Sequence, residues 1–325
     1  MQKNWQLLRD KQKTWDSLKI KSQLMRSIRE FFWAKNFLEI DTPILSTHFP
    51  IEPNIYLSPV TWQHKNQVFY LAPSPEFALK RALAAGSGNC FAISKCVRDL
   101  EDLGPTHNLE FNMLEFYEVD HDYTHVLQTI QDLFKYLGFT YPWEKTTVRE
   151  LFTKYANMDL DDNLDTQSII KTALSKGYNV DGVTTWEPLF NQIWANEIEP
   201  HFPKDKGIFV LDYPAQISTL CKPCPDPRYG QRFEFYINGL EFGNCYTELT
   251  DPTLQLKNFQ MTQDERTAQG LPNHPLDTEL LEALKTLPAC SGIAVGIERL
   301  AMFLADTTDI QDVVFMPTSQ MLYTK

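Results

Sequence analysis

The chain has 325 residues and a formal net charge of −12. A protein that binds nucleic acid mainly through its phosphates usually carries a basic surface, so this charge argues against general DNA or RNA binding. Hydrophobic residues make up 43% of the chain and aromatic residues 13%, which is typical of a globular protein without repeats or long disordered tracts. The length allows one large domain or two smaller ones.

Charged residues such as Arg26, Glu30 and Lys35 interrupt the longest apolar stretches, so no run reaches membrane-spanning length. The N-terminal sequence MQKNWQLLRDKQKTW is polar and lacks the hydrophobic core of a secretion signal. Six scattered cysteines favour free thiols in a reducing compartment over a disulfide framework. We therefore expect a cytoplasmic protein.

Hydrophobic periodicity and turn residues predict the secondary structure along the chain. The expected elements, in order, are helix 18–36, a strand in segment 37–45 that is ended by Thr42-Pro43, strand 68–73, helix 74–86 with Ser74 as its cap, strands 90–98 and 109–120, helix 124–137, strands 207–214 and 232–249, helix 253–268, and a strand-helix pair at 292–305. Strands and helices do not alternate regularly, which favours an α+β fold with a mostly antiparallel sheet flanked by helices. No linker-like stretch suggests a second domain, so we expect a single domain over 1–325. Segment 146–205 mixes helix and loop and shows no recognisable chemistry.

The sequence GIAVGIERLAMFLA, residues 292–305, places small residues before Glu298-Arg299 and an apolar helical run. A dinucleotide-binding fingerprint would open a βαβ unit and be followed by an acidic residue. This stretch lies near the C-terminus, so its position excludes that interpretation.

This stretch is one of three segments that together match the motifs of one enzyme class. HNLEFNMLEFY (107–117) with the preceding Arg98, GLEFGNCYTEL (239–249) and GIAVGIERL (292–300) resemble, in order, the ATP and amino-acid segments of class II aminoacyl-tRNA synthetases, most closely those of lysyl-tRNA synthetase. FLEIDTPIL (37–45) resembles the first motif of that class, a helix and strand at a dimer interface, which implies a homodimer. The resemblance covers nearly the whole chain, and its four motifs occur in the right order.

Activation of a carboxylate by ATP needs cations near the phosphates, because charge develops at the α-phosphoryl centre during in-line attack. Arg98 lies at a predicted strand end, and a guanidinium suits bidentate contact with the α-phosphate. The resemblance implies that His107 and Arg299 hold the outer phosphates, and that Phe111 stacks on adenine with Arg299 on its other face. The other ATP-binding residues that it implies are Asp99, Glu101, Asn108, Glu241, Phe242 and Gly296.

Two carboxylates, Glu234 and Glu241, stand seven residues apart and resemble those that hold Mg²⁺, which prefers oxygen ligands. Taken alone, the acidic pair would more often belong to a solvated surface. Arg98 or Arg299 alone would more often form a surface salt bridge. Their joint occurrence favours the binding roles.

The second motif departs from the family. The usual Arg-(Asn/Asp)-Glu triplet appears as Arg98-Asp99-Leu100-Glu101, as though one residue were inserted, and Pro105-Thr106 replace an arginine that often precedes the histidine. We expect this loop to differ locally, which weakens the implied roles of Asp99 and Glu101. In the third motif Glu298 replaces the usual aspartate.

A buried site for an ammonium group needs a carboxylate, because an unpaired charge is costly to desolvate. Glu248 in NCYTEL matches the family's partner for the ε-ammonium, and Glu76 matches the contact to the other amino group. A structural role for Glu248 is the alternative. The remaining substrate-binding residues that the resemblance implies are Ser74, Tyr117, Asn244, Tyr246 and Ala294.

Two features differ from lysyl-tRNA synthetases. The first helix is predicted to begin near residue 18, so we expect no anticodon-binding barrel ahead of it, and Ala294 stands where the synthetases have glycine. Both features are similar to the stand-alone ligases of this class, which attach lysine, preferably (R)-β-lysine, to a lysine of translation elongation factor P. One methyl group in a packed pocket can shift selectivity by roughly 1–3 kcal/mol. We expect an AMP-forming lysine–protein ligase that needs no enzyme nucleophile and does not bind tRNA.

Two other functions stay open: tRNA charging by a truncated lysyl-tRNA synthetase, and regulation by a non-catalytic protein that binds ATP or lysine. The CKPC sequence (221–224) lacks the four ligands of a structural zinc site, so two free thiols in a mobile loop are expected there. His201 and His274 are expected to be ordinary surface residues.

Overall fold

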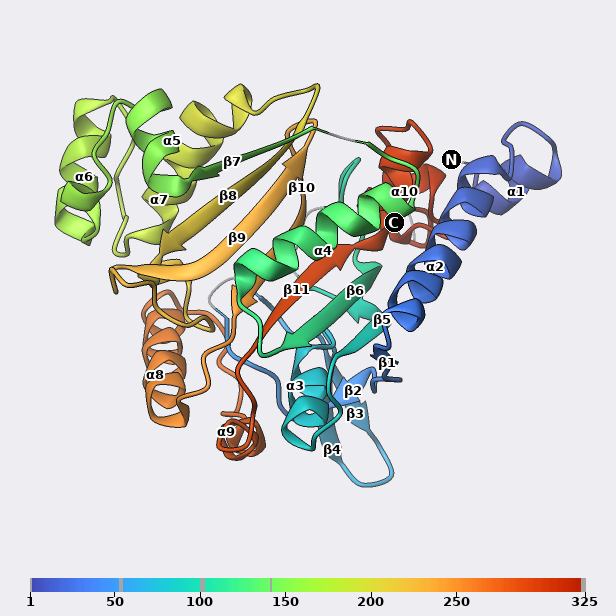
Figure 1. Ribbon diagram of the computed structural model, residues 1–325, viewed down its shortest axis with the longest axis horizontal. Helices are drawn as coiled ribbons and strands as arrows, with labels where there is room; N and C mark the ends of the chain where they lie inside the picture. Colours follow the sequence, from blue (N-terminus) through green and yellow to red (C-terminus); the bar gives the residue numbers. More distant parts are fainter. Residues whose placement is uncertain (1, 53–54, 100–102, 141, 323–325) are drawn as a thin grey trace. The chain divides into compact units, whose positions relative to one another are not determined.

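A computed structural model describes residues 2–52, 55–99, 103–140 and 142–322 (Figure 1). The chain divides into two compact units: unit 1 comprises Met1–Val119, Thr262–Pro288 and Ala294–Lys325, and unit 2 comprises Asp120–Met261 and Ala289–Ile293. The expected single domain over 1–325 stays a prediction.

Each helix and strand lies within a single unit, except for α8 and β11. Unit 1 contains α1 (Asn4–Arg9), α2 (Asp16–Ala34), β1 (Leu38–Glu39), β2 (Leu45–Ser46), β3 (Pro59–Trp62), β4 (Gln67–Leu71), α3 (Glu76–Ala84), β5 (Cys90–Val97), β6 (Glu110–Val119), α9 (Thr278–Ala283) and α10 (Ile297–Leu304). Unit 2 contains α4 (Tyr123–Tyr136), β7 (Trp143–Thr147), α5 (Val148–Tyr155), α6 (Thr166–Ser175), α7 (Glu187–Ile193), β8 (Gly207–Pro214), β9 (Tyr229–Ile237) and β10 (Leu240–Thr247). Residues of both units make up α8 (Pro252–Ala268) and β11 (Cys290–Gly296).

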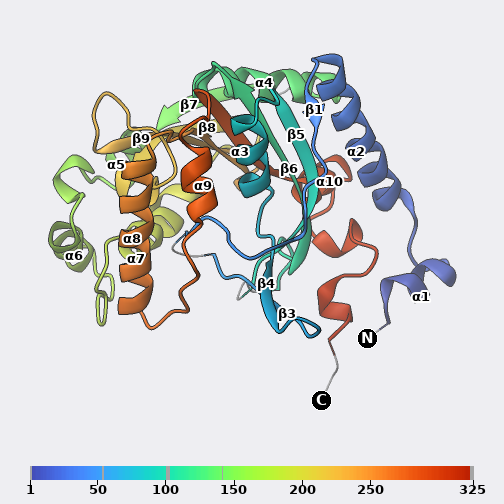
Figure 2. The same ribbon diagram turned by 90° about the horizontal axis from the view of Figure 1, so that it is seen from below.

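In unit 1 the main sheet has the order β1-β5-β6 and includes the C-terminal end of β11, while β2, β4 and β3 form a second, antiparallel sheet. The apolar face of α2 packs on the main sheet, where the ring of Phe32 lies 5.0 Å from Phe91 and 4.7 Å from Phe116. In Figure 2 α9 lies beside α3. An ion pair of 2.6 Å between Arg81 and the fully buried Asp277 fastens this contact.

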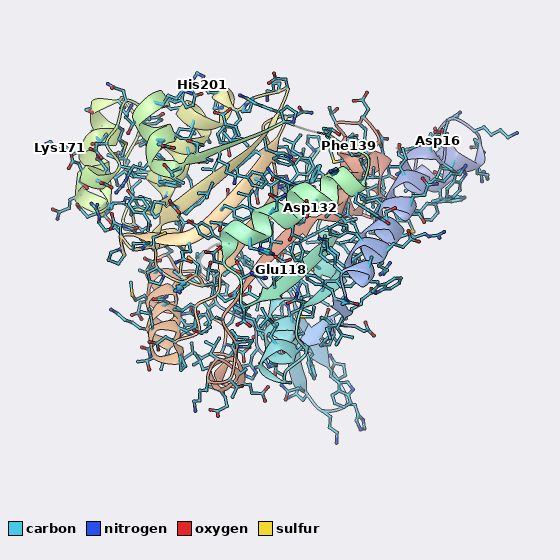
Figure 3. All side chains as sticks on the ribbon, viewed as in Figure 1. Asp16, Glu118, Asp132, Phe139, Lys171 and His201 are labelled. Carbon is cyan, nitrogen blue, oxygen red and sulfur yellow. The ribbon has the colours of Figure 1, made fainter. Side chains whose placement is uncertain are left out.

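In unit 2 the strand order is β11-β10-β9-β8-β7; β10 with β9 and β9 with β8 are antiparallel, and β8 with β7 is parallel. Helix α4 packs on β9 and β10, and α5 packs on β7 and β8. Lys171 and His201 lie on the outer side of the helices around them (Figure 3). His201 stacks on Tyr155 with ring centroids 4.5 Å apart, and its exposure confirms the surface prediction.

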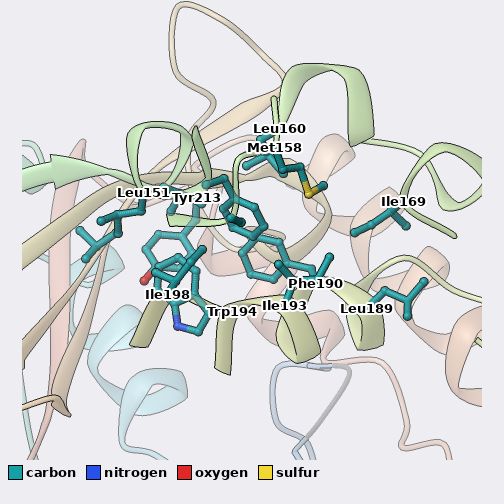
Figure 4. Close-up of a cluster of buried hydrophobic side chains, with 14 of the residues drawn as sticks. Leu151, Met158, Leu160, Ile169, Leu189, Phe190, Ile193, Trp194, Ile198 and Tyr213 are labelled. Carbon is teal, nitrogen blue, oxygen red and sulfur yellow. The ribbon is translucent and has the colours of Figure 1, made fainter. Parts of the chain in front are cut away.

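The segment 146–205 forms a hydrophobic core against β8. Side chains from α5, α6, α7 and the turns between them converge there (Figure 4). The members labelled in Figure 4 are Leu151, Met158, Leu160, Ile169, Leu189, Phe190, Ile193, Trp194, Ile198 and Tyr213. This segment therefore supplies packing for unit 2.

The α+β fold class and the mostly antiparallel pairing are confirmed. The strand predicted in segment 37–45 ends before Thr42-Pro43 as expected, but it is short: β1 covers only Leu38–Glu39, and Leu45–Ser46 forms the separate strand β2. Pro43 has no N–H to donate to a ladder, which accounts for the break. Ser74 does not cap α3: Pro75 is the N-cap residue and makes no side-chain cap bond. Among the described helices, none is long and apolar enough to cross a membrane.

Candidate active site

The pairing of β5 with β6 places Arg98 next to Phe111. Cys96 is opposite Phe111 in the ladder, and Arg98 follows β5 directly, so its guanidinium lies 5.5 Å above the Phe111 ring. Arg98 Nε also donates to the Pro73 carbonyl at 3.3 Å. The aromatic face fixes the orientation of the guanidinium and partly shields it from water, which favours the binding of an anion by Arg98. The structure places Arg98 over Phe111. The stacking of adenine between Phe111 and Arg299 stays a prediction.

Arg299 contacts His107. Gly296 is the N-cap residue of α10, and Arg299 in the first turn of that helix lies 2.9 Å from His107, between Nη2 and Nε2. Thr106 Oγ1 is 3.0 Å from Nδ1 of the same imidazole. The two residues predicted to hold the outer phosphates are therefore neighbours within unit 1.

Asn108 next to His107 is buried and fastens the start of β6. Its Nδ2 donates to the Glu110 carbonyl at 2.6 Å, and its Oδ1 accepts from the Thr318 amide at 2.9 Å. These bonds are structural, so a contact of Asn108 with ATP stays a prediction.

Glu298, the residue that replaces the family's aspartate, anchors α10 in the core. Its carboxylate accepts from Lys21 Nζ at 2.6 Å and from the Asn112 backbone and side-chain nitrogens at 2.8 and 2.6 Å. These bonds compensate the cost of burying the charge and fix the first turn that carries Arg299. Sequence analysis did not single out Lys21, because the pair is separated by 277 residues.

Asp99 pairs with the segment before β3. Its amide donates to the Tyr56 carbonyl at 3.1 Å, and its Oδ2 accepts from the Ser58 hydroxyl at 3.2 Å. Glu101 lies outside the described residues, so its ATP-binding role stays a prediction.

The substrate residues predicted in unit 1 are mostly buried. Glu76 opens α3 and makes a 2.5 Å ion pair with Lys80, while Ser74 precedes it and is also buried. Tyr117 on β6 donates to Glu115 Oε1 at 2.7 Å. Glu115 is a further candidate that sequence analysis missed. Its place two residues from Tyr117, on the same strand face, was the available signal.

A second group of predicted residues lies in unit 2, where β9 and β10 pair. Arg232 Nε donates to Asn244 Oδ1 at 3.0 Å, and Asn244 Nδ2 donates to the Tyr246 hydroxyl at 2.8 Å. The Arg232 guanidinium also lies 4.5 Å from the Tyr213 ring centroid and 5.7 Å from that of Tyr246. Burial works to lower the pKa of Arg232, but Tyr246, Glu234 and Tyr213 outweigh it and raise that pKa above its ordinary value. Arg232 thus orients the predicted carboxylate contacts Asn244 and Tyr246.

Glu234 is held by one cation and two phenols. Oε1 accepts from Arg232 Nη2 at 2.6 Å, while Oε2 accepts from Tyr213 at 2.7 Å and from Tyr236. Burial and the Glu234 charge raise the pKa of both tyrosines well above its ordinary value, so both phenols keep the protons that they donate.

Glu241 shares a sheet face with Glu234. It is opposite Tyr236 in the β9–β10 ladder, and Tyr236 and Glu234 point to the same side of β9. No group of three or more His, Cys, Asp or Glu side chains suited to a metal occurs among the described residues. Two carboxylates on one face fit Mg²⁺ that is also held by phosphates, since this ion commonly uses one or two carboxylates. Phe242, beside Glu241, is buried.

Glu248 lies just beyond β10, with its side chain buried. Its amide donates to the Cys290 carbonyl at 2.9 Å, and its backbone forms a bridge with Cys221. The CKPC segment thus forms isolated backbone bridges, Cys221 with Glu248 and Pro223 with Gly230. The thiols are free, as predicted, and burial first of all raises the pKa of Cys221 and of Cys224 to about 12.

Comparison with known proteins matches these segments to one family. The model of the class II tRNA synthetases (D, K and N) matches residues 1–320. The chain is similar to elongation factor P–(R)-β-lysine ligases: that of Hamiltonella defensa is 31% identical over 311 residues (92% of this chain, 94% of that protein). The ligase of Yersinia enterocolitica is 32% identical over 311 residues (92% and 94%), and that of Pasteurella multocida 32% over 323 residues (96% and 97%).

Proposed function

This chain belongs to the class II (D, K and N) tRNA synthetase family, and on that premise we propose that it is an ATP-dependent ligase for elongation factor P. It activates (R)-β-lysine, or lysine, and attaches it to a lysine side chain of the factor. The similarity to (R)-β-lysine ligases over more than nine-tenths of both chains supports this substrate pair.

In the first step, a carboxylate oxygen of the amino acid attacks the α-phosphorus of ATP and pyrophosphate leaves. Arg98 stabilises the charge that develops on the α-phosphoryl oxygens, and Arg299 with His107 orients the leaving phosphates. In the second step, the ε-amine of the acceptor lysine attacks the acyl carbon, an amide forms and AMP leaves. Both steps proceed without an enzyme nucleophile.

In this proposal the resemblance gives Glu248 and Glu76 as partners of the substrate's amino groups and Tyr117 as a further substrate contact. Asn244 and Tyr246, oriented by Arg232, contact its carboxylate. A buried carboxylate is the group that an incoming ammonium requires, and the burial of Glu248 supports its role.

Mg²⁺ bound with ATP would be held by Glu241 and Glu234, and it neutralises phosphate charge when bound. The shared sheet face of these residues supports the assignment. Because Glu234 also serves Arg232 and two tyrosines, we expect weak Mg²⁺ binding without ATP.

The adenylation proposal rests on two arginines of unit 1 whose side chains are held in place. Arg98 lies over the Phe111 ring, and Arg299 contacts His107. Two assays test it. Pyrophosphate exchange dependent on lysine or (R)-β-lysine separates an enzyme from a non-catalytic ATP- or lysine-binding regulator. Parallel transfer assays with purified elongation factor P and with tRNA then identify the acceptor, and labelling of tRNA alone would refute the protein-ligase proposal.

We also infer a homodimer formed through residues 24–45, and a cytoplasmic enzyme. The exposed Trp33 and Leu38, which are 52% and 50% exposed, support an interface at the end of α2 and at β1. Light scattering at micromolar concentration distinguishes the dimer from a monomer.

A further inference from the structure

A buried arginine outside the predicted site joins two loops of unit 1. Arg266, near the end of α8, is only 1% exposed. Its Nη1 donates to the carbonyls of Glu52 and Ile55, each at 3.0 Å. Its Nε and Nη2 donate to the Pro272 carbonyl at 3.0 and 2.7 Å. A guanidinium offers five N–H donors in a fixed plane, so one side chain can hold both loops in a single arrangement.

His274 completes this arrangement and corrects its predicted place on the surface. It is buried, with Nε2 3.4 Å from Arg266 Nη2 and its ring 5.3 Å from that of Tyr70. Because a guanidinium can only donate, His274 Nε2 must accept, which requires a neutral imidazole. Burial and the charge of Arg266 lower the pKa of His274 to about 4, in agreement with this geometry.

The loop that Arg266 holds leads directly to Asp99. The guanidinium lies 5.1 Å from the ring of Tyr56, and the Tyr56 carbonyl accepts from the Asp99 amide at 3.1 Å. Two residues further on, the Ser58 hydroxyl donates to Asp99 Oδ2. Asp99 is the neighbour of Arg98. A continuous series of contacts therefore runs from Arg266 to the arginine assigned to the α-phosphate.

We propose that Arg266 is a positioning residue for adenylate formation: it fixes residues 55–58 and, through Asp99, the end of β5 that carries Arg98. The inference rests on the proposed function. It also gives a physical reason for a buried cation there, since its bonds go to backbone carbonyls that set the path of a loop. A displacement of about 1 Å at a reacting group can cost roughly a hundredfold in rate.

The test uses the full-length protein with Arg266→Lys, which keeps the charge but loses the fork of donors. We expect kcat of pyrophosphate exchange to fall by about tenfold to a hundredfold, while KM for lysine changes less than about twofold. Arg81→Lys is the matched control, because Arg81 is a partly buried arginine of the same unit whose guanidinium donates to the Phe77 carbonyl and to Asp277. It should keep kcat within about twofold of the wild type.

Ser58→Ala approaches the same contacts from the other end and protects the test against an unfolded Arg266 variant. It should lower kcat in the same direction, and its effect should be smaller in the Arg266→Lys background than in the wild type, as for coupled residues. A folded Arg266→Lys protein with wild-type kcat, or a Ser58→Ala protein with wild-type kcat, would overturn the inference. A wild-type protein that shows no exchange activity would instead refute the proposed function. In that case ATP binding, measured by calorimetry, tests the inference. Equal ATP affinities of the wild type and Arg266→Lys would overturn it.

Discussion

Arg299 Nη2 and His107 Nε2 lie 2.9 Å apart and join the first turn of α10 to the residues before β6. The arginine can only donate, so Nε2 is the acceptor and the imidazole proton is on Nδ1, where Thr106 Oγ1 lies 3.0 Å away. His107 is therefore neutral in this arrangement, and its orientation is set from both sides. The positive charge of the pair belongs to Arg299 alone, so we expect Arg299 to contribute more than His107 to the proposed phosphate site.

We expect Arg299→Ala and Arg98→Ala each to slow adenylate formation by roughly 10²–10³-fold, because each removes a charged donor from the developing phosphoryl charge. Pyrophosphate exchange at saturating ATP and lysine measures the loss. Asp99→Ala should cost less, since Asp99 holds the loop and bears no positive charge. Near-normal turnover of either arginine variant would remove that residue from the phosphate site.

Glu248→Gln should abolish lysine-dependent exchange while ATP affinity survives. The amide keeps the size of the side chain but loses the negative charge that an ammonium group needs in a buried position. Lysine KM and ATP binding by calorimetry are the two readouts. An unchanged lysine KM would assign Glu248 a structural role next to Cys221.

Local patterns account for the parts of the fold that sequence predicted well. The helix expected at 18–36 is α2, because its buried Leu24, Ile28 and Phe32 recur at helical spacing. The strand predicted at 207–214 coincides with β8. The site motifs were found in the same way, since each of them is a short contiguous stretch.

Contacts between distant segments could not be predicted. No local sequence pattern predicts that Lys21 pairs with Glu298, or that Arg232 on β9 orients Asn244 on β10. His274 was misplaced for the same reason: histidine has no strong preference for core or surface, and its burial depends on Arg266 as a donor. Hydrophobic patterns do not predict polar side chains that are buried because they have hydrogen-bond or ion-pair partners.

His274 should make the folded state sensitive to acid. Its pKa in the folded chain is lowered to about 4 from about 6.5, by burial and then by Arg266, so the unfolded chain binds the proton more readily. The stability is fully present above about pH 6.5 and falls as the pH drops toward 4. Between pH 7 and 4.5 this residue should account for about 2 kcal/mol of lost unfolding free energy. Urea unfolding of wild type and His274→Gln at both pH values measures the difference, and parallel pH dependences would contradict it.

Ala294 is a half-buried residue of β11 near Gly296. Glycine at this position would remove a methyl group and free the backbone, whereas alanine fills that space. If Ala294 shapes the pocket for a β-amino acid, Ala294→Gly should improve the use of lysine relative to (R)-β-lysine by about tenfold in kcat/KM, the scale of one methyl-sized change. Both substrates should still depend on Glu248, because the substitution leaves the carboxylate in place. Adenylation kinetics with both amino acids, on wild type and variant, give the preference ratio. An unchanged ratio would make Ala294 neutral, and the preference for a β-amino acid would then have to arise from other residues of the pocket.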